Sequence, residues 1–207
     1  MCGRYHIDTE EDIQEMREIL QEISKKYADS ETHASMKTGE VFPTNLAPVV
    51  GADGPVIMKW GFPMHGSAQT IINARSETAA QKPMFSAALR QRRVVIPTTG
   101  FYEWTHENGK SKDKFLFRVP GQKMMYLAGL YTNFMKPDGS REDYYTILTT
   151  DANDSMRPYH NRMPVHIAAG ERIAWLNDPA SAQDILFRRQ PELAAVKVPK
   201  AEQVSFF

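Results

Sequence analysis

Residues 124–150, MMYLAGLYTNFMKPDGSREDYYTILTT, decide the fold. Two runs rich in apolar, aromatic and β-branched side chains, Met124–Leu130 and Tyr144–Thr150, are joined through Pro137-Asp138-Gly139, which predicts two strands connected by a turn. Similar runs recur on both sides of this stretch. They cover Pro55–Trp60, Arg93–Pro97, Phe101–Thr105, Lys114–Val119 and Met163–Ile167, with the turn pair Asn108-Gly109 between two of them.

Helical periodicity is strongest near the start of the chain. Thr9 is a favourable N-cap, and the acidic residues at 10–12 suit a first helical turn before apolar residues recur at helical spacing from Ile13 to Tyr27. The polar segment Ala28–Gly39 predicts a loop, and Pro43–Pro48 predicts an extended stretch. Short helices are predicted over Ser76–Gln81, Met84–Arg90, Glu171–Leu176 and Ser181–Arg188. Many strands with a few helices around them predict one α+β domain over residues 1–207 with a barrel-like sheet core.

Composition narrows the class of protein. A hydrophobic share of 42% and a charged share of 24% are ordinary for a globular domain, and the formal net charge of zero excludes a strongly basic nucleic-acid binder. The single cysteine excludes an internal disulfide and favours a reducing compartment. Apolar runs stay below the ~18 residues that span a bilayer. We expect a protein without membrane contact that is cytoplasmic, or nuclear if the source is eukaryotic.

That cysteine, Cys2, directly follows the initiator methionine. Removal of Met1 would leave an α-amine and a thiol on adjacent carbons. The amine can condense with an aldehyde to an imine, which the thiol closes to a thiazolidine. The α-amine has a pKa near 8, so a useful fraction is neutral at physiological pH, and Arg4 nearby would favour the reactive thiolate. The alternative is a small residue that packs in the core.

Two motifs carry further candidates. In Asn73-Ala74-Arg75, the Asn73 amide can orient an amine or a thiol, and Arg75 can fork onto a phosphate, although a helix cap with a surface arginine is the alternative. In Gly100–Trp104, Glu103 lies among aromatic residues. If Glu103 is buried, its pKa is raised, which suits a general acid and base. If side chains alternate along the strand so that Glu103 faces outward, it is an ordinary solvated residue.

His160 is the best-placed imidazole, in Tyr159–Pro164, because histidine titrates in the range needed to exchange protons with a sugar oxygen. The alternative is an ordinary turn histidine. The sequence lacks zinc-ligand spacings, a P-loop and a G-x-S-x-G motif, so we expect no metal, no cofactor and no nucleotide hydrolysis.

Seven motifs in this order resemble the SOS-response-associated peptidase (SRAP) family. They are Met1–Tyr5, Asn45–Pro48, Trp60–Phe62, Asn73–Thr78, Gly100–Trp104, Thr149-Thr150 and His160–Pro164, which together span most of the chain. Each motif alone is weak, but the combination anchored on a cysteine at position 2 is specific.

The resemblance implies an α+β fold of antiparallel sheets that form a barrel-like core with peripheral helices. It also implies that Cys2 crosslinks covalently to abasic sites in single-stranded DNA through a thiazolidine. It implies that Asn73 positions Cys2, that Glu103 is the acid/base residue and that His160 acts on the deoxyribose. It assigns phosphates to Arg4, Arg75 and Arg162, a wedge beside the lesion to Met84 and Phe85, and the pocket lining to Thr149. It also implies autoproteolytic or peptidase activity, with lyase activity as a further expectation, and we expect a monomer.

One departure concerns base stacking. Family members often carry a tryptophan pair shortly after the Trp-Gly motif, where this chain has Pro63–Ser67. Stacking contributes roughly 1–3 kcal/mol per base in single-strand binders. We therefore expect weaker binding to intact strands, unless Trp60 and His65 supply the contact.

Two other functions remain open at this stage. A cysteine peptidase with Cys2 as nucleophile and His160 as base would not need a free α-amine. A non-catalytic single-strand binder would form no covalent product, and the zero net charge argues against it.

Overall fold

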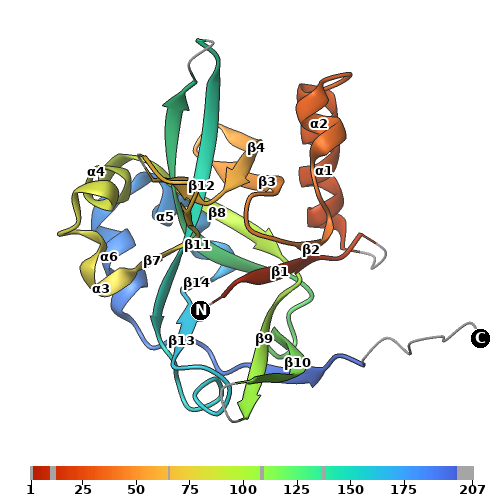
Figure 1. Cartoon of the computed structure of the whole chain (residues 1–207), viewed down its shortest axis with the longest axis vertical. Coiled ribbons are helices and arrows are strands. Elements are labelled where there is room, and N and C mark those ends of the chain that lie inside the picture. Colours follow the sequence, from red (N-terminus) through yellow and green to blue (C-terminus); the bar gives the residue numbers. More distant parts are fainter. Residues whose placement is uncertain (1, 10–12, 65, 108–109, 137–138, 200–207) are drawn as a thin grey trace, which may run out of the picture.

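Five strands close into a barrel at the centre of the molecule (Figure 1). The computed structural model describes residues 2–9, 13–64, 66–107, 110–136 and 139–199. The barrel strands are β3 (Leu46–Gly51), β4 (Gly54–Trp60), β8 (Arg93–Thr98), β11 (Met125–Met135) and β12 (Arg141–Asp151). The ring runs β12-β4-β3-β8-β11 and closes because β11 also pairs with β12. All of its pairings are antiparallel except β12 with β4, which is parallel.

A second, antiparallel sheet packs beside the barrel in the order β15-β10-β9-β1-β2. Its strands are β1 (Arg4–Ile7), β2 (Gly39–Val41), β9 (Gly100–Glu107), β10 (Lys110–Arg118) and β15 (Ala194–Lys197). The register between β1 and β9 places Arg4 opposite Tyr102 and Tyr5 opposite Phe101. The start of the chain is therefore held next to the aromatic motif that contains Glu103.

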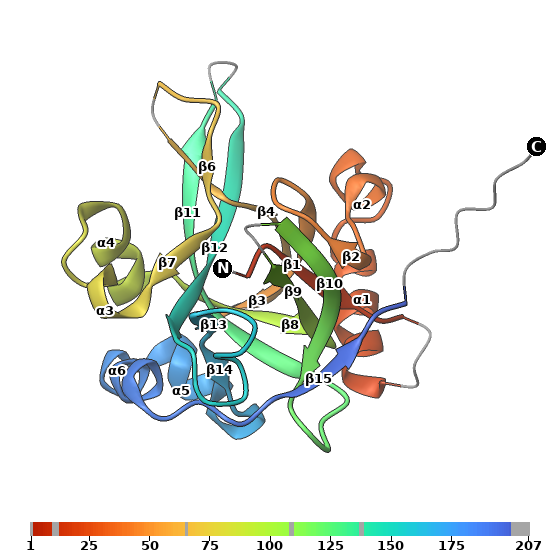
Figure 2. The ribbon, with the colours of Figure 1, turned by 60° about the horizontal axis from the view of Figure 1, so that its bottom comes forward.

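Short strands extend the barrel sheet. They are β7 (Asn73–Arg75), β13 (Arg162–Pro164) and β14 (His166–Ile167), whereas β5 (Phe62–Pro63) and β6 (Thr70–Ile71) form a separate two-stranded sheet. β7 runs parallel to β12, β13 runs antiparallel to β12, and β14 pairs with β11. Figures 1 and 2 both show the first strand starting beside β7 and β13.

Helices lie on two sides of the sheets. On one side are α1 (Gln14–Lys26) and α2 (Glu31–Ser35), and on the other are α3 (Ser76–Ala79), α4 (Pro83–Gln91), α5 (Arg172–Asn177) and α6 (Pro179–Phe187), with the 3-10 turn η1 (Ala169–Glu171) before α5 (Figure 2). Buried Arg93 ties α4 and α5 to β8 by donating to the carbonyls of Leu89, Arg90, Trp175 and Leu176 at 2.5–3.0 Å.

The core beneath the first strand is aromatic. Tyr5 and Tyr145 share a hydrogen bond of 2.6 Å between their hydroxyls, and the Trp60 ring lies 5.2 Å from that of Tyr5. All three side chains are fully buried. These contacts fix β1 against β4 and β12, which brings Cys2 to the barrel.

The predicted α+β class with a barrel-like core is confirmed, as are the predicted main strands and the four short helices, to within a few residues at each end. Two local predictions are wrong. Helix α1 begins at Gln14 with Ile13 as its cap, so Thr9 is not the N-cap, and residues 10–12 lie outside the described structure. The predicted loop over 28–39 contains α2, whose N-cap Ser30 accepts from the His33 N–H at 3.1 Å.

We predict that Gly129→Ala destabilises the barrel. A Cβ at Gly129 would lie 2.4 Å from Ile96 Cδ1 and 3.1 Å from the Thr146 carbonyl oxygen, where β11 passes between β8 and β12. Overpacking of this kind costs about 1–3 kcal/mol, which lowers Tm by roughly 2–4 °C per kcal/mol in a chain of this size. Thermal denaturation measures the change. Gly170→Ala is the control, since nothing lies within 4 Å of its Cβ position, and equal Tm values for both variants would contradict the prediction.

Candidate functional site

Cys2 is buried at the point where the chain enters β1, with 1% of its surface exposed. Its thiol lies 3.9 Å from the Arg4 carbonyl oxygen, to which it donates a weak hydrogen bond. Burial raises the pKa of the Cys2 thiol far above its ordinary value, and the negative charge of Glu103 raises it further. The thiol is therefore held neutral in the folded protein, contrary to the expectation that Arg4 would favour a thiolate.

Asn73 fixes the backbone of Cys2. Its Nδ2 donates to the Cys2 carbonyl oxygen at 2.9 Å, across 71 positions of sequence. β7 carries Asn73 to this place because it pairs with β12, with Asn73 opposite Ile147. Within the described part of the chain the Asn73 Oδ1 is buried and accepts no hydrogen bond, and the Ser76 Oγ is in the same state. Buried polar atoms of this kind mark a place for water or for a polar ligand.

Glu103 is 4% exposed on β9, which decides between the two alternatives for this residue: it is buried and not solvated. Burial raises its pKa to about 6. The β1–β9 register, with Arg4 opposite Tyr102, brings Glu103 to the start of β1, where its charge acts on Cys2. A carboxyl group with this pKa can accept and release protons close to neutral pH.

His160 lies in the turn that precedes β13. Its Nδ1 accepts a hydrogen bond of 2.9 Å from the Arg162 backbone N–H. A neutral imidazole that accepts at Nδ1 carries its proton on Nε2. β13 pairs with β12, where Asp151 is opposite Arg162, so this turn is joined to the strand that also carries Thr149 and pairs with β7.

The three arginines assigned to phosphates differ in their availability. The Arg75 side chain is exposed at the junction of β7 and α3. Arg4 is partly exposed, and its guanidinium pairs with Glu40 at 3.1 Å while it lies 4.5 Å from the Phe42 ring and 4.8 Å from the Trp104 ring. Arg162 is buried. Its Nη atoms bind the carboxylates of Glu77 and Asp151 and the Thr149 carbonyl oxygen, so a phosphate would have to displace one of them.

The residues assigned to the wedge and to the pocket lining also differ in their exposure to solvent. Met84 on α4 is 42% exposed and can insert beside a ligand, whereas Phe85 is buried with its ring centre 5.9 Å from that of Phe62. In this structure the Phe85 side chain therefore packs α4 against the buried core. Thr149 is fully buried, and its Oγ1 is 3.5 Å from the Ala74 carbonyl oxygen.

Trp60 cannot replace the missing tryptophan pair. It is fully buried, and its Nε1 donates to the Ile72 carbonyl oxygen at 3.0 Å. The prediction that Trp60 stacks on bases is wrong because the indole belongs to the barrel core, while His65 lies outside the described residues. Two aromatic residues with exposed surface, Phe42 and Trp104, have their rings beside Arg4.

Sequence reasoning did not single out the acids and the lysine around these residues. Glu40 on β2 pairs with Arg4 and also with Lys114, whose Nζ is 2.5 Å from the Glu40 Oε2 and 3.9 Å from the centre of the Tyr102 ring. Glu77 holds Arg162. Glu77 lies inside the Asn73–Thr78 motif, which was the available signal, whereas Glu40 had none.

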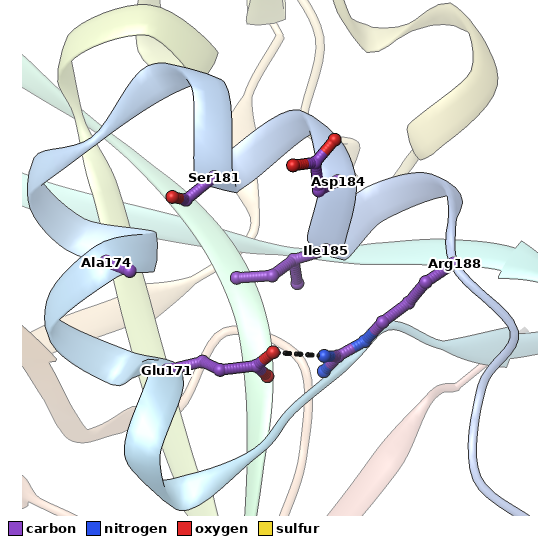
Figure 3. Close-up of a pocket in the computed structure, with 6 residues that line it drawn as sticks. All are labelled: Glu171, Ala174, Ser181, Asp184, Ile185 and Arg188. Carbon is purple, nitrogen blue, oxygen red and sulfur yellow. Dashed lines mark hydrogen bonds and ion pairs between the residues drawn. The ribbon is translucent and has the colours of Figure 1, made fainter.

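Other features lie apart from this arrangement. A cavity of about 270 Å³ between η1, α5 and α6 contains the ion pair Glu171–Arg188 (Figure 3), and its lining includes none of the residues assigned to chemistry above.

In the described part of the chain no group of three or more His, Cys, Asp or Glu side chains could hold a metal ion. Among those same residues, no helix is both long and apolar enough to cross a membrane.

The chain is similar to proteins of known family. It is 32% identical over 200 residues to the abasic site processing protein YoqW of Bacillus subtilis strain 168, covering 90% of this chain and 86% of the relative. It is 28% identical over 148 residues to the abasic site processing protein YedK of Escherichia coli K12, covering 71% and 64%.

Solved structures share the fold. A protein from Bacteroides thetaiotaomicron superposes with a TM-score of 0.76 at 19% identity, covering 96% of this chain and 92% of that one. A protein from Bordetella bronchiseptica gives 0.73 at 23% identity, covering 96% and 100%. The family model described as SOS response associated peptidase (SRAP) matches residues 1–204, and the chain therefore belongs to this family.

Proposed function

We propose that this protein, as a single domain over residues 1–207, processes abasic sites by crosslinking to them in single-stranded DNA through Cys2. The observation that carries the proposal is that Asn73 binds the Cys2 carbonyl oxygen, while the register of β1 on β9 brings Glu103 to the start of β1. The relatives named abasic site processing proteins give it further support. An abasic site presents an aldehyde when its sugar ring opens, and a terminal aminothiol is a chemical match for an aldehyde.

The reaction needs both groups of Cys2. After Met1 is removed, the α-amine attacks the C1′ aldehyde to form a carbinolamine, which loses water to give an imine. The thiol then adds to the imine carbon, and its proton passes to the nitrogen, which closes the thiazolidine. The net change is one amine, one thiol and one aldehyde converted to a five-membered ring and one water. The thiol can stay neutral until the imine forms, which agrees with its raised pKa.

Asn73 and Glu103 have separate tasks in this sequence. Asn73 holds the Cys2 carbonyl by one hydrogen bond, and its buried Oδ1 is available to accept a hydrogen bond from the amine or the carbinolamine. Glu103 takes the proton that the α-ammonium must lose and returns it to the departing water, because its pKa of about 6 permits both steps near neutral pH.

His160 acts on the sugar. With Nδ1 occupied by the Arg162 N–H, its Nε2 donates a hydrogen bond to the ring oxygen of the deoxyribose, which favours ring opening. Arg4 and Arg75 contact phosphates, and Met84 fills the space left by the missing base. The partly exposed Phe42 and Trp104 rings offer surfaces on which a neighbouring base can stack. None of these contacts reads a sequence, as suits a lesion that occurs anywhere.

A cysteine peptidase that uses Cys2 and His160 is the second candidate, because the family description includes peptidase activity. Burial of the Cys2 thiol argues against a peptidase that turns over repeatedly, because a cysteine peptidase needs a thiolate and burial disfavours one. We propose that any peptidase activity is confined to removal of the residue or segment in front of Cys2, and that lyase activity would follow from the same imine.

We predict that Cys2→Ala abolishes the covalent product. The wild-type protein, mixed with a single-stranded oligonucleotide that contains one abasic site, should give a slower band on a denaturing gel, because the thiazolidine survives denaturation. Intact mass spectrometry should show loss of Met1 together with addition of the oligonucleotide minus water. Lack of a slower band with the wild type, or an equal band with Cys2→Ala, would refute the proposal.

We predict that one extra residue, left uncleaved before Cys2, abolishes crosslinking. The extension converts the α-amine to an amide, which cannot form an imine, while the thiol is unchanged. A variant that starts Met-Pro-Cys and retains its proline tests this on the same gel, with mass spectrometry as proof of the N-terminus. A peptidase mechanism would tolerate the extension, so peptide cleavage at the wild-type rate would favour that alternative, whereas crosslinking at the wild-type rate would refute the role of the α-amine.

We predict that Glu103 sets the pH dependence of crosslinking. Since burial raises its pKa to about 6, the carboxylate base is lost as the pH falls through 6, and the wild-type rate should rise between pH 5 and 7 and then level off. Glu103→Gln removes this step, and the rate should follow the free amine, whose pKa is near 8. Quenched time courses from pH 5 to 9 measure both profiles, and identical profiles would exclude Glu103 as the base.

A further inference from the structure

The Arg162 guanidinium lies in an ion cluster that leaves it little freedom. Its two Nη atoms bind the two carboxylate oxygens of Glu77 at 2.8 Å each, in a forked geometry. Nη1 also lies 2.5 Å from the Asp151 Oδ1, and Nη2 lies 2.6 Å from the Thr149 carbonyl oxygen. Paired, two-point contacts of this type are stronger and more directional than single ones.

Glu77 is the principal partner in this cluster. Burial by itself would raise its pKa, but the hydrogen bonds and the positive charge of Arg162 outweigh burial and lower it. Asp151 is 85% exposed at its side chain, so water screens its share of the attraction. Glu77 comes from α3 and Arg162 from β13, and their pairing therefore joins two elements that flank β12.

The backbone of Arg162 is the link to His160. Its N–H donates to the His160 Nδ1 at 2.9 Å, which places the proton of the neutral ring on Nε2. The Arg162 carbonyl oxygen also lies 3.3 Å from Nδ1, and it would favour the opposite tautomer if the turn rotated slightly. The choice between the two tautomers thus depends on how firmly Arg162 is held.

We propose that Glu77 is a positioning residue that acts through Arg162 to keep His160 in the tautomer protonated at Nε2. The expected effect of Glu77 on crosslinking rests on the proposed function, whereas its effect on the His160 tautomer does not. The Arg162 side chain then holds the His160 turn in place through its bond to Glu77, and it cannot bind a phosphate while that bond is intact.

The first test needs no DNA. Nitrogen chemical shifts of the imidazole, measured on ¹⁵N-histidine-labelled protein near pH 8, distinguish the two neutral tautomers, and the His160 signals are assigned by their loss in His160→Ala. We expect the Nε2-protonated form in the wild type and a mixture of forms in Glu77→Gln. Glu142→Gln is the matched control, because Glu142 also pairs with cations, Lys59 at 3.7 Å and Lys136 at 3.4 Å, but lies on β12 and, among the described residues, makes no ion pair with Arg162.

The second test uses the abasic oligonucleotide. We expect Glu77→Gln to crosslink about tenfold more slowly than the wild type at pH 7, with a changed pH profile, and Glu142→Gln to stay within about twofold of it. Arg162→Lys keeps the charge but loses the fork, so it should reproduce both the tautomer mixture and the slower rate.

The opposite results would overturn the proposal. If Glu77→Gln leaves the His160 signals unchanged and binds intact single strands more tightly, Glu77 merely competes with phosphate for Arg162. If Arg162→Lys lowers DNA affinity without changing His160 in the free protein, Arg162 is a phosphate ligand alone. Lack of crosslinking by the wild type would refute the proposed function, while the DNA-free comparison would still test the role of Glu77.

Discussion

Strand β12 is the element on which the rest of the structure depends, because it pairs with four other strands. Its pairing with β4 and β11 closes the barrel, and its pairing with β7 and β13 attaches the two segments that carry Asn73 and Arg162. Every backbone hydrogen bond in these ladders satisfies a polar group that would be costly to bury alone. The same strand therefore builds the core and sets the distances within the candidate site.

Burial determines the chemistry of that site. The Cys2 thiol and the Glu103 carboxyl both lie where water is excluded, and for both groups this disfavours the charged form. A neutral thiol is a poor nucleophile, but a thiol that adds to an imine already formed at the α-nitrogen of the same residue does not need to ionise in advance. A carboxyl with a pKa near 6 can move the proton that imine formation requires. The electrostatics thus suit an aminothiol mechanism better than a thiolate mechanism.

The arginines show how one residue type serves two purposes. Arg75 is exposed, and Arg4 is partly exposed with one ion pair to Glu40, whereas Arg162 is enclosed by carboxylates and a carbonyl oxygen. A zero net charge is compatible with DNA contact if a few such groups are correctly placed, since phosphate binding depends on local charge. Arg4, between the Phe42 and Trp104 rings, combines a cation with stacking surfaces at the edge of the site.

The sequence by itself determined the class of fold and indicated a candidate for the reactive group. Alternation and turn residues predicted the long strands, and the position of Cys2 after Met1 indicated an aminothiol. The sequence could not determine that Glu103 is buried, that Trp60 is in the core and not on the surface, or that Glu77 holds Arg162. Strand alternation leaves open which face of a strand turns inward, and ion pairs between residues 85 positions apart form only when β13 and α3 meet across β12. The tertiary structure decided these points, because burial and charge pairing arise from elements that are distant in the chain.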